Sequence, residues 1–240
     1  MFVFKRRNLI IISVLIITAL TFILCFGALG MQSVAESDKA KIKIVLDAGH
    51  GGVDGGVSGV STGVKESEIN LKVVKKLAYY LESCGMGVVL TRSTDAGLYG
   101  MATSNLKKKD MKKRQDIIRS AQPNLVVSIH MNQYSVSTRR GAQVFYKEGD
   151  EFSKILANSI QNSFNSMEEA VRECSALTGD YYILNCSSYP SVICECGFLS
   201  NPQDEALLIT DKYQDSIAYA VFKGIVGYLS QTSFNYFNNY

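Results

Sequence analysis

The two histidines of this 240-residue chain each follow an apolar run that reads as a β-strand. His50 lies in a glycine-rich loop after the run Ile44–Leu46, and His130 closes the run Leu125–Ile129. Open α/β sheets place their ligand sites at the carboxyl ends of strands, and neutral imidazole is a common zinc ligand. We therefore expect the fold to bring the two imidazoles together at a metal ion.

Two carboxylates extend this candidate site. A catalytic zinc site uses three protein ligands and leaves one position for water, and Glu66 is the best-placed third ligand. It follows the glycine loop directly and begins a predicted helix, so its side chain can turn back toward His50. Glu68 points elsewhere on that helix and is expected to be solvated. Glu195 is a lone carboxylate within an apolar strand, where an unpaired charge is costly, and it is the candidate to take a proton from the water.

Each of these residues also has an ordinary structural interpretation. A histidine at a strand end can be a hydrogen-bonded structural residue, and Glu66 can be a carboxylate stabilised by a helix N-terminus. Glu195 can pair with a lysine or an arginine. The loop, with seven glycines between Asp47 and Val64, could cradle a phosphate, but it has neither the G-x-G-x-x-G nor the G-K-[ST] pattern. The prediction rests on the four residues occurring together.

Strands that alternate with helices must position these side chains. Continuous apolar runs favour buried strands, whereas apolar residues at helical spacing favour helices. The expected strands are 41–46, 88–91, 125–129, 141–146, 181–184 and 191–196, and the expected helices are 67–84, 110–121, 151–167 and 213–229, with a helical turn at 206–209. Ser67 could cap the first helix. The alternation predicts a three-layer α/β sandwich, in which helices flank a mainly parallel mixed sheet.

The N-terminus reads as an export segment. Lys5–Arg7 precede the apolar, uncharged run Leu9–Met31, which is long enough to span a bilayer, and Ser33–Ala35 offers the small residues that a signal peptidase needs. Both a cleaved signal peptide and a retained membrane anchor stay open, and either places the domain outside the membrane. The expected division is a signal peptide or anchor at 1–35, a linker at 36–41, a catalytic domain at 42–230 and a flexible tail at 231–240.

Charge and cysteine content limit the classes of function. The net charge of +3 equals the three charges of Lys5–Arg7, so the rest of the chain is formally neutral and lacks the basic balance of a nucleic-acid binder. The basic residues of 107–114 could contact an anionic polymer, but a solvated loop and helix face is the favoured interpretation. Cys25 lies in the apolar run, which leaves five cysteines. We expect mostly buried free thiols, with one disulfide possible.

Five segments carry a resemblance to a known family. They are Leu46-Asp-Ala-Gly-His-Gly-Gly-Val-Asp-Gly-Gly56, Gly63-Val-Lys-Glu66, Leu90-Thr-Arg92, Ser128-Ile-His-Met-Asn132 and Glu195-Cys-Gly-Phe-Leu-Ser-Asn201. In this order the chain resembles the zinc-dependent N-acetylmuramoyl-L-alanine amidases of the Amidase_3 family over roughly residues 42–230.

The resemblance implies a zinc ion bound by His50, Glu66 and His130, with Glu195 as the catalytic carboxylate. The implied substrate is peptidoglycan, at the amide that joins the lactyl group of N-acetylmuramic acid to L-alanine of the peptide stem. Zinc would polarise the carbonyl and lower the pKa of water, and Glu195 would accept the water's proton and return it to the leaving amine. A zinc exopeptidase, such as a carboxypeptidase or an aminopeptidase, and a catalytically silent wall-binding protein remain the alternatives.

Within the family, the short form with an apolar N-terminal segment resembles the CwlD-type germination and spore cortex amidases. Gly141-Ala-Gln-Val-Phe-Tyr146 favours this subgroup. The implied role is removal of peptide stems before muramic-δ-lactam formation, in the space between the forespore membranes of a spore former. The partners expected are cortex peptidoglycan, the membrane if the N-terminal segment is uncleaved, and an accessory sporulation protein, with a monomeric catalytic domain and no nucleic acid.

Overall fold

The structure is a computed structural model that describes residues 15–18, 20–22 and 42–238, with side chains described as far as residue 232. The chain divides into two compact units, Met1–Lys41 and Ile42–Tyr240. Residues 15–18 and 20–22 are helical. In the described ranges, no helix has both the length and the apolar character needed to cross a bilayer. Most of the predicted export segment and the whole of the predicted linker 36–41 lie outside the described residues.

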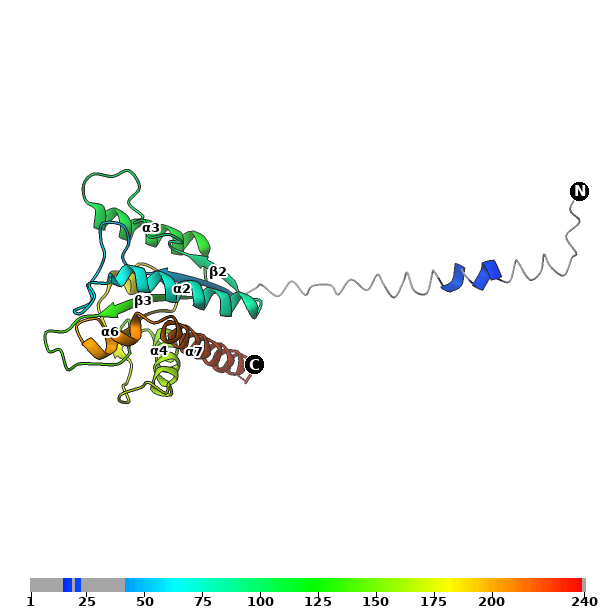
Figure 1. The fold of residues 1–240 in the computed structure, drawn as a ribbon. Coiled ribbons are helices and arrows are strands. Elements are labelled where there is room, and N and C mark those ends of the chain that lie inside the picture. Colours follow the sequence, from blue (N-terminus) through cyan, green and yellow to red (C-terminus); the bar gives the residue numbers. More distant parts are fainter. Residues whose placement is uncertain (1–14, 19, 23–41, 239–240) are drawn as a thin grey trace, which may run out of the picture. The chain divides into compact units, whose positions relative to one another are not determined.

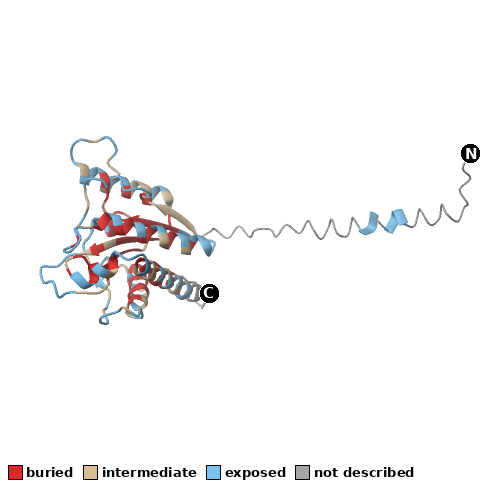
Figure 2. Ribbon diagram, viewed as in Figure 1, coloured by how far each residue is buried: buried red, intermediate tan, exposed pale blue. Residues whose placement is uncertain are grey.

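A six-stranded sheet forms the centre of the second unit (Figure 1). Its strands run in the order β2-β1-β3-β6-β4-β5, with β4 antiparallel to β6 and every other neighbouring pair parallel. Their bounds are β1 (Lys43–Ala48), β2 (Gly87–Leu90), β3 (Leu125–Asn132), β4 (Gln143–Tyr146), β5 (Leu177–Thr178) and β6 (Ser191–Phe198). The central strands are buried on both faces, as Figure 2 shows, because helices cover the two sides.

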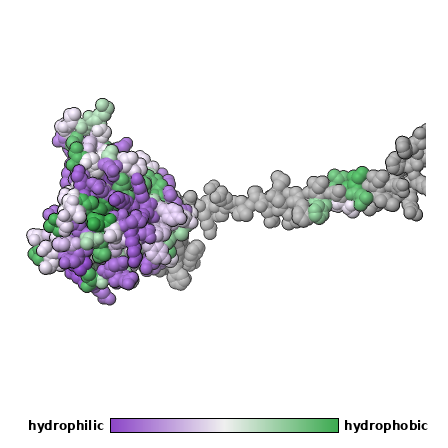
Figure 3. Space-filling model, in the orientation of Figure 1, coloured by the Kyte–Doolittle hydropathy of each residue, from purple (hydrophilic) through white to green (hydrophobic). Residues whose placement is uncertain are grey.

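Two helical layers enclose the sheet. One apolar core packs the sheet against α2 (Glu66–Ser83), α4 (Glu151–Asn165) and α7 (Asp211–Asn238), whereas a smaller core packs the other face against α3 (Leu106–Ala121) and α5 (Tyr182–Asn185). A short helix, α6 (Pro202–Leu208), follows β6. This arrangement confirms the predicted three-layer α/β sandwich with a mainly parallel mixed sheet. Figure 3 shows that the outer surface on the side seen mixes hydrophilic and hydrophobic residues.

Strand residues alternate between the two cores. Leu46 packs with the α2, α4 and α7 side, whereas its neighbour Val45 packs with the α3 and α5 side. On α2, the buried residues Ile69, Val73 and Leu77 form the predicted helical stripe. Apolar periodicity therefore determines which face of each element is buried.

Three predictions about local structure were wrong. The segment 181–184 is not a strand but the helix α5, in which the consecutive residues Ile183 and Leu184 are both buried; a strand would turn one of them outward. Ser67 does not cap α2, because it lies inside the helix and the N-cap is Lys65. The helix predicted at 110–121 starts four residues earlier, since α3 begins at Leu106.

The flexible tail predicted from residue 231 is helical as far as Asn238. No glycine or proline follows Gly227 to end the helix. Hydroxyl side chains in the last described turns also donate back to helix carbonyls, from Ser230 Oγ to Val226 O and from Thr232 Oγ1 to Tyr228 O. Residues 239–240 lie outside the described range.

The first two connections of the sheet place β2 and β3 on opposite sides of β1. From β1 the chain passes through α2 to β2 on one side, and from β2 it returns through α3 to β3 on the other side of β1. Such a reversal opens a crevice at the carboxyl ends of the two strands, where open α/β sheets bind ligands. His50 follows β1 directly and His130 lies near the end of β3, so the topology brings both histidines to this crevice.

Candidate metal centre

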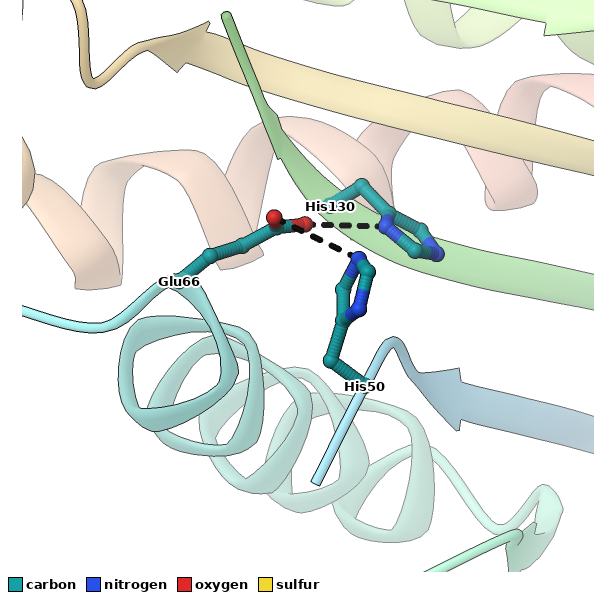
Figure 4. A group of neighbouring side chains, drawn as sticks. All are labelled: His50, Glu66 and His130. Atoms are coloured by element: carbon teal, nitrogen blue, oxygen red, sulfur yellow. Dashed lines mark hydrogen bonds and ion pairs between the residues drawn. The ribbon is translucent and has the colours of Figure 1, made fainter. Parts of the chain in front are cut away.

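His50, Glu66 and His130 converge at the carboxyl ends of β1 and β3 (Figure 4). His50 comes from the loop after β1, Glu66 is the first residue of α2, and His130 comes from β3. Glu66 Oε2 lies 3.3 Å from His50 Nε2, and Glu66 Oε1 lies 2.9 Å from His130 Nδ1. One donor atom from each residue lies within 4.8 Å of the other two. The structure thus places together the three residues predicted as metal ligands.

The donor set suits zinc. Zinc prefers imidazole nitrogen and carboxylate oxygen at about 2.0–2.2 Å, and tetrahedral geometry then separates neighbouring donor atoms by about 3.4 Å. The 3.3 Å between His50 Nε2 and Glu66 Oε2 agrees with that separation. Two histidines and one carboxylate are also the ligand set of hydrolytic zinc sites that keep a fourth position open. His50, Glu66 and His130 therefore fit a catalytic zinc ion.

Asp54 orients the first histidine from behind. Its Oδ1 lies 2.9 Å from His50 Nδ1 and also accepts a hydrogen bond from the Gly56 amide. A proton on Nδ1 leaves the lone pair of Nε2 free to face the other donors, which is the usual role of a carboxylate behind a metal-bound histidine. The sequence reasoning did not single out Asp54. Its position four residues after His50 in the same glycine loop was the available signal.

Hydrogen bonds hold Glu66 ionised. The side chain is 2% exposed and accepts from the backbone amides of Val57 and Met131 and from Asn70 Nδ2. Burial raises the pKa of Glu66, but the hydrogen bond and charge of His130, with the other donors, lower it to about 2. Glu68 is exposed, which confirms the expectation that it is solvated.

Two buried arginines fix the backbone that carries His50. Arg92 donates to the carbonyls of Ala48 and Gly49, and Arg114 donates to those of Ala48 and His50. His50 itself has a φ of 60°, a left-handed conformation that is uncommon for a residue with a side chain. Hydrogen bonds to three successive carbonyls support this conformation, so the arginines position the candidate ligand His50 through its backbone.

The interpretation of the basic residues of 107–114 as a solvated face is wrong for Arg114. Lys107, Lys108 and the other lysines are exposed, but Arg114 is 1% exposed and forms ion pairs with Asp47 and Asp110. Burial raises the pKa of Asp47, while the Arg114 charge and hydrogen bonds from neighbouring hydroxyls lower it to about 2. The i, i+4 pair Asp110 and Arg114 was the only hint in the sequence that this arginine turns inward.

Gly49 is required by a close approach. A Cβ at this position would lie 2.2 Å from His130 Cε1 and would clash with the imidazole ring. Only glycine lets the β1 loop pass against the ring of the second histidine. The loop therefore both carries one histidine and packs against the other.

Glu195 lies beside the three ligands. It pairs in register with His130 on the neighbouring parallel strand, and both residues line the same pocket. Its Oε2 is buried with no hydrogen-bond partner in the part of the chain that the structure describes. Burial raises the pKa of Glu195 to about 7, against the opposing charge of His130. An unpartnered carboxyl group beside a set of candidate metal ligands is suited to proton transfer.

The neighbouring cysteines are structural. Cys194 and Cys196 are fully buried in the core on the opposite face of β6 from Glu195, so their thiols face away from the candidate metal centre. All five cysteines from Cys84 onward are free thiols, and three of them are buried. This confirms the preference for mostly buried free thiols over a disulfide framework.

A pocket of about 540 Å³ contains the whole constellation. His50, Glu66, His130 and Glu195 all line it, together with Lys107 and Met111 of α3 and Tyr182 and Ile183 of α5. The wrongly predicted segment 181–184 thus forms a wall of the site.

Comparison with known proteins gives this geometry a context. Residues 44–226 match the Amidase_3 family, described as N-acetylmuramoyl-L-alanine amidase. The germination-specific N-acetylmuramoyl-L-alanine amidase of Bacillus subtilis is 33% identical over 195 residues, which cover 78% of this chain and 80% of that protein. The amidase LytC of the same organism is 32% identical over 187 residues, covering 77% of this chain and 35% of LytC.

Solved structures agree with this match. The CwlD amidase of Clostridioides difficile, solved in complex with the GerS lipoprotein, superposes with a TM-score of 0.76 at 37% identity and covers 79% of this chain and 99% of that one. An N-acetylmuramoyl-L-alanine amidase of Clostridium difficile 630 superposes with a TM-score of 0.71 at 29% identity, with 79% and 97% covered.

Proposed function

This chain belongs to the Amidase_3 family of N-acetylmuramoyl-L-alanine amidases, and from that premise we propose that it is a zinc enzyme whose metal ligands are His50, Glu66 and His130 and whose catalytic carboxylate is Glu195. Its reaction is hydrolysis of the amide between N-acetylmuramic acid and L-alanine in peptidoglycan. The observation that carries the zinc proposal is the convergence of both histidines and a buried glutamate, with donor atoms within 4.8 Å of one another.

The mechanism follows from the positions of the side chains. When bound, zinc supplies a Lewis acid for the scissile carbonyl and lowers the pKa of water. The carboxylate of Glu195, whose Oε2 is buried without a hydrogen-bond partner among the described residues, accepts the proton of the attacking water and returns it to the nitrogen of L-alanine as the C–N bond breaks. Asp54 keeps the Nε2 atom of His50 directed into the site.

Muropeptide digestion tests both the zinc requirement and the bond that is cleaved. Purified protein is incubated with muropeptides before chelation, after chelation and after zinc is restored, and the products are identified by mass spectrometry. We expect intact peptide stems, loss of activity with chelator and recovery with zinc. Free amino acids in place of intact stems would favour a zinc exopeptidase instead, and full activity after complete zinc removal would refute the zinc requirement.

We further propose that the enzyme acts on spore cortex and removes peptide stems during muramic-δ-lactam formation. Support comes from the name of the Bacillus subtilis relative, which is germination-specific, and from the match over 99% of the solved CwlD chain. In a spore-forming host that lacks the gene, we expect cortex without muramic-δ-lactam and spores that fail to complete germination. Normal lactam content in that strain would refute the cortex role.

The place of action is proposed to be outside the cytoplasmic membrane. Residues 1–35 would export the domain, as a cleaved signal peptide or a retained anchor, and residues 42–230 would be the catalytic domain. A membrane-associated accessory protein is a reasonable partner, since the related CwlD amidase was solved with the GerS lipoprotein. Fractionation and N-terminal sequencing of the native protein would distinguish a cleaved signal from an anchor.

A further inference from the structure

A second, smaller pocket adjoins the candidate metal centre. Its volume is about 210 Å³, and it shares Asn132 and Tyr181 with the larger pocket that contains His130 and Glu195. Asn132 follows His130 by two residues on β3, which corresponds to about 7 Å along a strand. The sheet register between β3 and β6 shifts between these two residues, and such an irregularity commonly redirects a side chain near a site. The two pockets are therefore adjacent.

Two cationic side chains line the smaller pocket. Arg139 and Arg172 are both exposed, and neither forms an ion pair within the described residues. The guanidinium of Arg139 stacks on the Tyr134 ring, with 4.8 Å between its central carbon and the ring centroid. Stacking occupies the face of a guanidinium but leaves its N–H edge free to bind an anion. By contrast, the adjacent Arg140 is already paired with Asp204 at 2.8 Å.

Aromatic residues make up much of the remaining wall of this pocket, beside the amide side chains of Asn132 and Gln143. Phe145, Phe198 and Tyr181 line it, and the rings of Phe145 and Tyr181 pack edge to face with centroids 5.5 Å apart. A binding site with two free guanidiniums and aromatic walls suits a carboxylate carried on a short aliphatic chain. Sugar rings of the glycan carry no such negative charge once the lactyl carboxyl is tied up in the amide. The charge therefore points to the peptide side of the substrate.

We propose that Arg139 and Arg172 bind the free carboxylate on the second residue of the peptide stem. This inference rests on the amidase function proposed above. An extended peptide advances about 3.3–3.6 Å per residue, so the carboxyl group of the second residue lies about 7 Å from the scissile nitrogen. This distance is similar to the step from His130 to Asn132, where the smaller pocket begins. The enzyme thus discriminates between stems whose second residue carries a free carboxylate and stems in which that group is a carboxamide.

Equilibrium binding tests the proposal without relying on turnover. The probe is an L-alanyl-γ-D-glutamyl stem peptide, compared with the same peptide whose α-carboxylate is amidated, and calorimetry is performed on the zinc-loaded Glu195→Gln protein. We expect the free acid to bind about tenfold more tightly than the amide. The Arg139→Gln/Arg172→Gln double variant in the same background should lose this preference, whereas Arg139→Lys/Arg172→Lys should keep part of it.

Lys75→Gln is the matched control, because Lys75 is an exposed cation on α2 that lines neither pocket. It should leave the preference unchanged. Equal binding of acid and amide, or a preference that survives in the glutamine double variant, would overturn the proposal. Digestion of the two corresponding muropeptides by the unmodified enzyme separates the two levels of inference. If neither is cleaved with zinc present, the amidase function fails, whereas equal cleavage contradicts only the carboxylate pocket.

Discussion

His130 and Glu195 stand opposite each other in the register of the parallel strands β3 and β6, and both line the same pocket. A proposed metal ligand and the proposed catalytic carboxylate are therefore held by the hydrogen bonds of the sheet. Side chains on rigid strands keep a geometry better than side chains on loops. The glycine loop and α2 supply the other two proposed ligands, His50 and Glu66, from the adjacent strand end. The relative positions of these proposed site residues are thus determined at the carboxyl ends of neighbouring strands.

Glu195→Gln separates metal binding from catalysis. The variant should retain zinc, because Glu195 is not among the converging ligands, but turnover should fall by about 10²–10⁴-fold, as for loss of a general base. The fold should survive, since Oε2 has no partner to lose among the described residues. The measurement is kcat on muropeptides together with zinc content. A normal turnover rate would remove Glu195 from the mechanism.

Asp54→Asn should weaken zinc binding without unfolding the protein. The neutral carboxamide cannot reproduce the charged acceptor that now faces His50 Nδ1 at 2.9 Å, and loss of such a partner typically lowers metal affinity by about 10–100-fold. Competition with a chromophoric chelator measures the change. Asp116→Asn is the control, because that carboxylate forms a surface pair with Lys112 and should leave affinity unchanged. Equal zinc affinities in the two variants would contradict the role of Asp54.

Arg114→Leu should strongly destabilise the domain. It would leave Asp47 buried at 2% exposure without its cation and would remove donors from the Ala48 and His50 carbonyls. Removing one partner of a buried ion pair costs about 3–5 kcal/mol of unfolding free energy. Urea denaturation measures this loss. Lys112→Leu, which breaks only the exposed pair with Asp116, should cost at most about 1 kcal/mol, so losses of similar size in both variants would refute the claim.

The lowered pKa of Asp47 also implies that the domain loses stability in acid. Its pKa in the folded protein is about 2, below the ordinary 3.8, so the unfolded chain binds its proton more readily. The stabilisation is therefore fully present above about pH 4 and decreases as the pH falls toward 2. Urea denaturation of the unmodified protein and Asp47→Asn at several pH values should show a stability difference that shrinks over this range. If the stability difference between the two proteins stays constant with pH, ionisation of Asp47 does not contribute to it.

Much of the fold followed from apolar patterning. The runs that end at His50 and His130 were recognisable as buried strands, and helical spacing identified α2, α4 and most of α7. The segment 181–184 was misassigned because four apolar and aromatic residues fit either a strand or a helical turn, and only packing against α3 selects the helix. Short apolar runs carry this ambiguity in general.

The sequence identified the candidate ligands and Glu195, but not the residues that support them. His50, Glu66, His130 and Glu195 were identified by rarity, position and resemblance, and the structure brings them into one pocket. The supporting residues were not identified, because the sequence does not say which of many charged residues turn inward. Arg114 resembled its exposed lysine neighbours, and its burial depends on Asp47, which lies 67 positions earlier.

Zinc content of matched histidine variants tests the central claim most directly. Metal analysis is performed on the unmodified protein, His50→Ala, His130→Ala and Glu195→Gln after dialysis against a weak chelator, with circular dichroism to verify folding. We expect about one tightly bound zinc per chain in the unmodified protein and in Glu195→Gln, and almost none in either histidine variant. One tightly bound zinc per chain in both folded histidine variants would contradict the proposed metal centre.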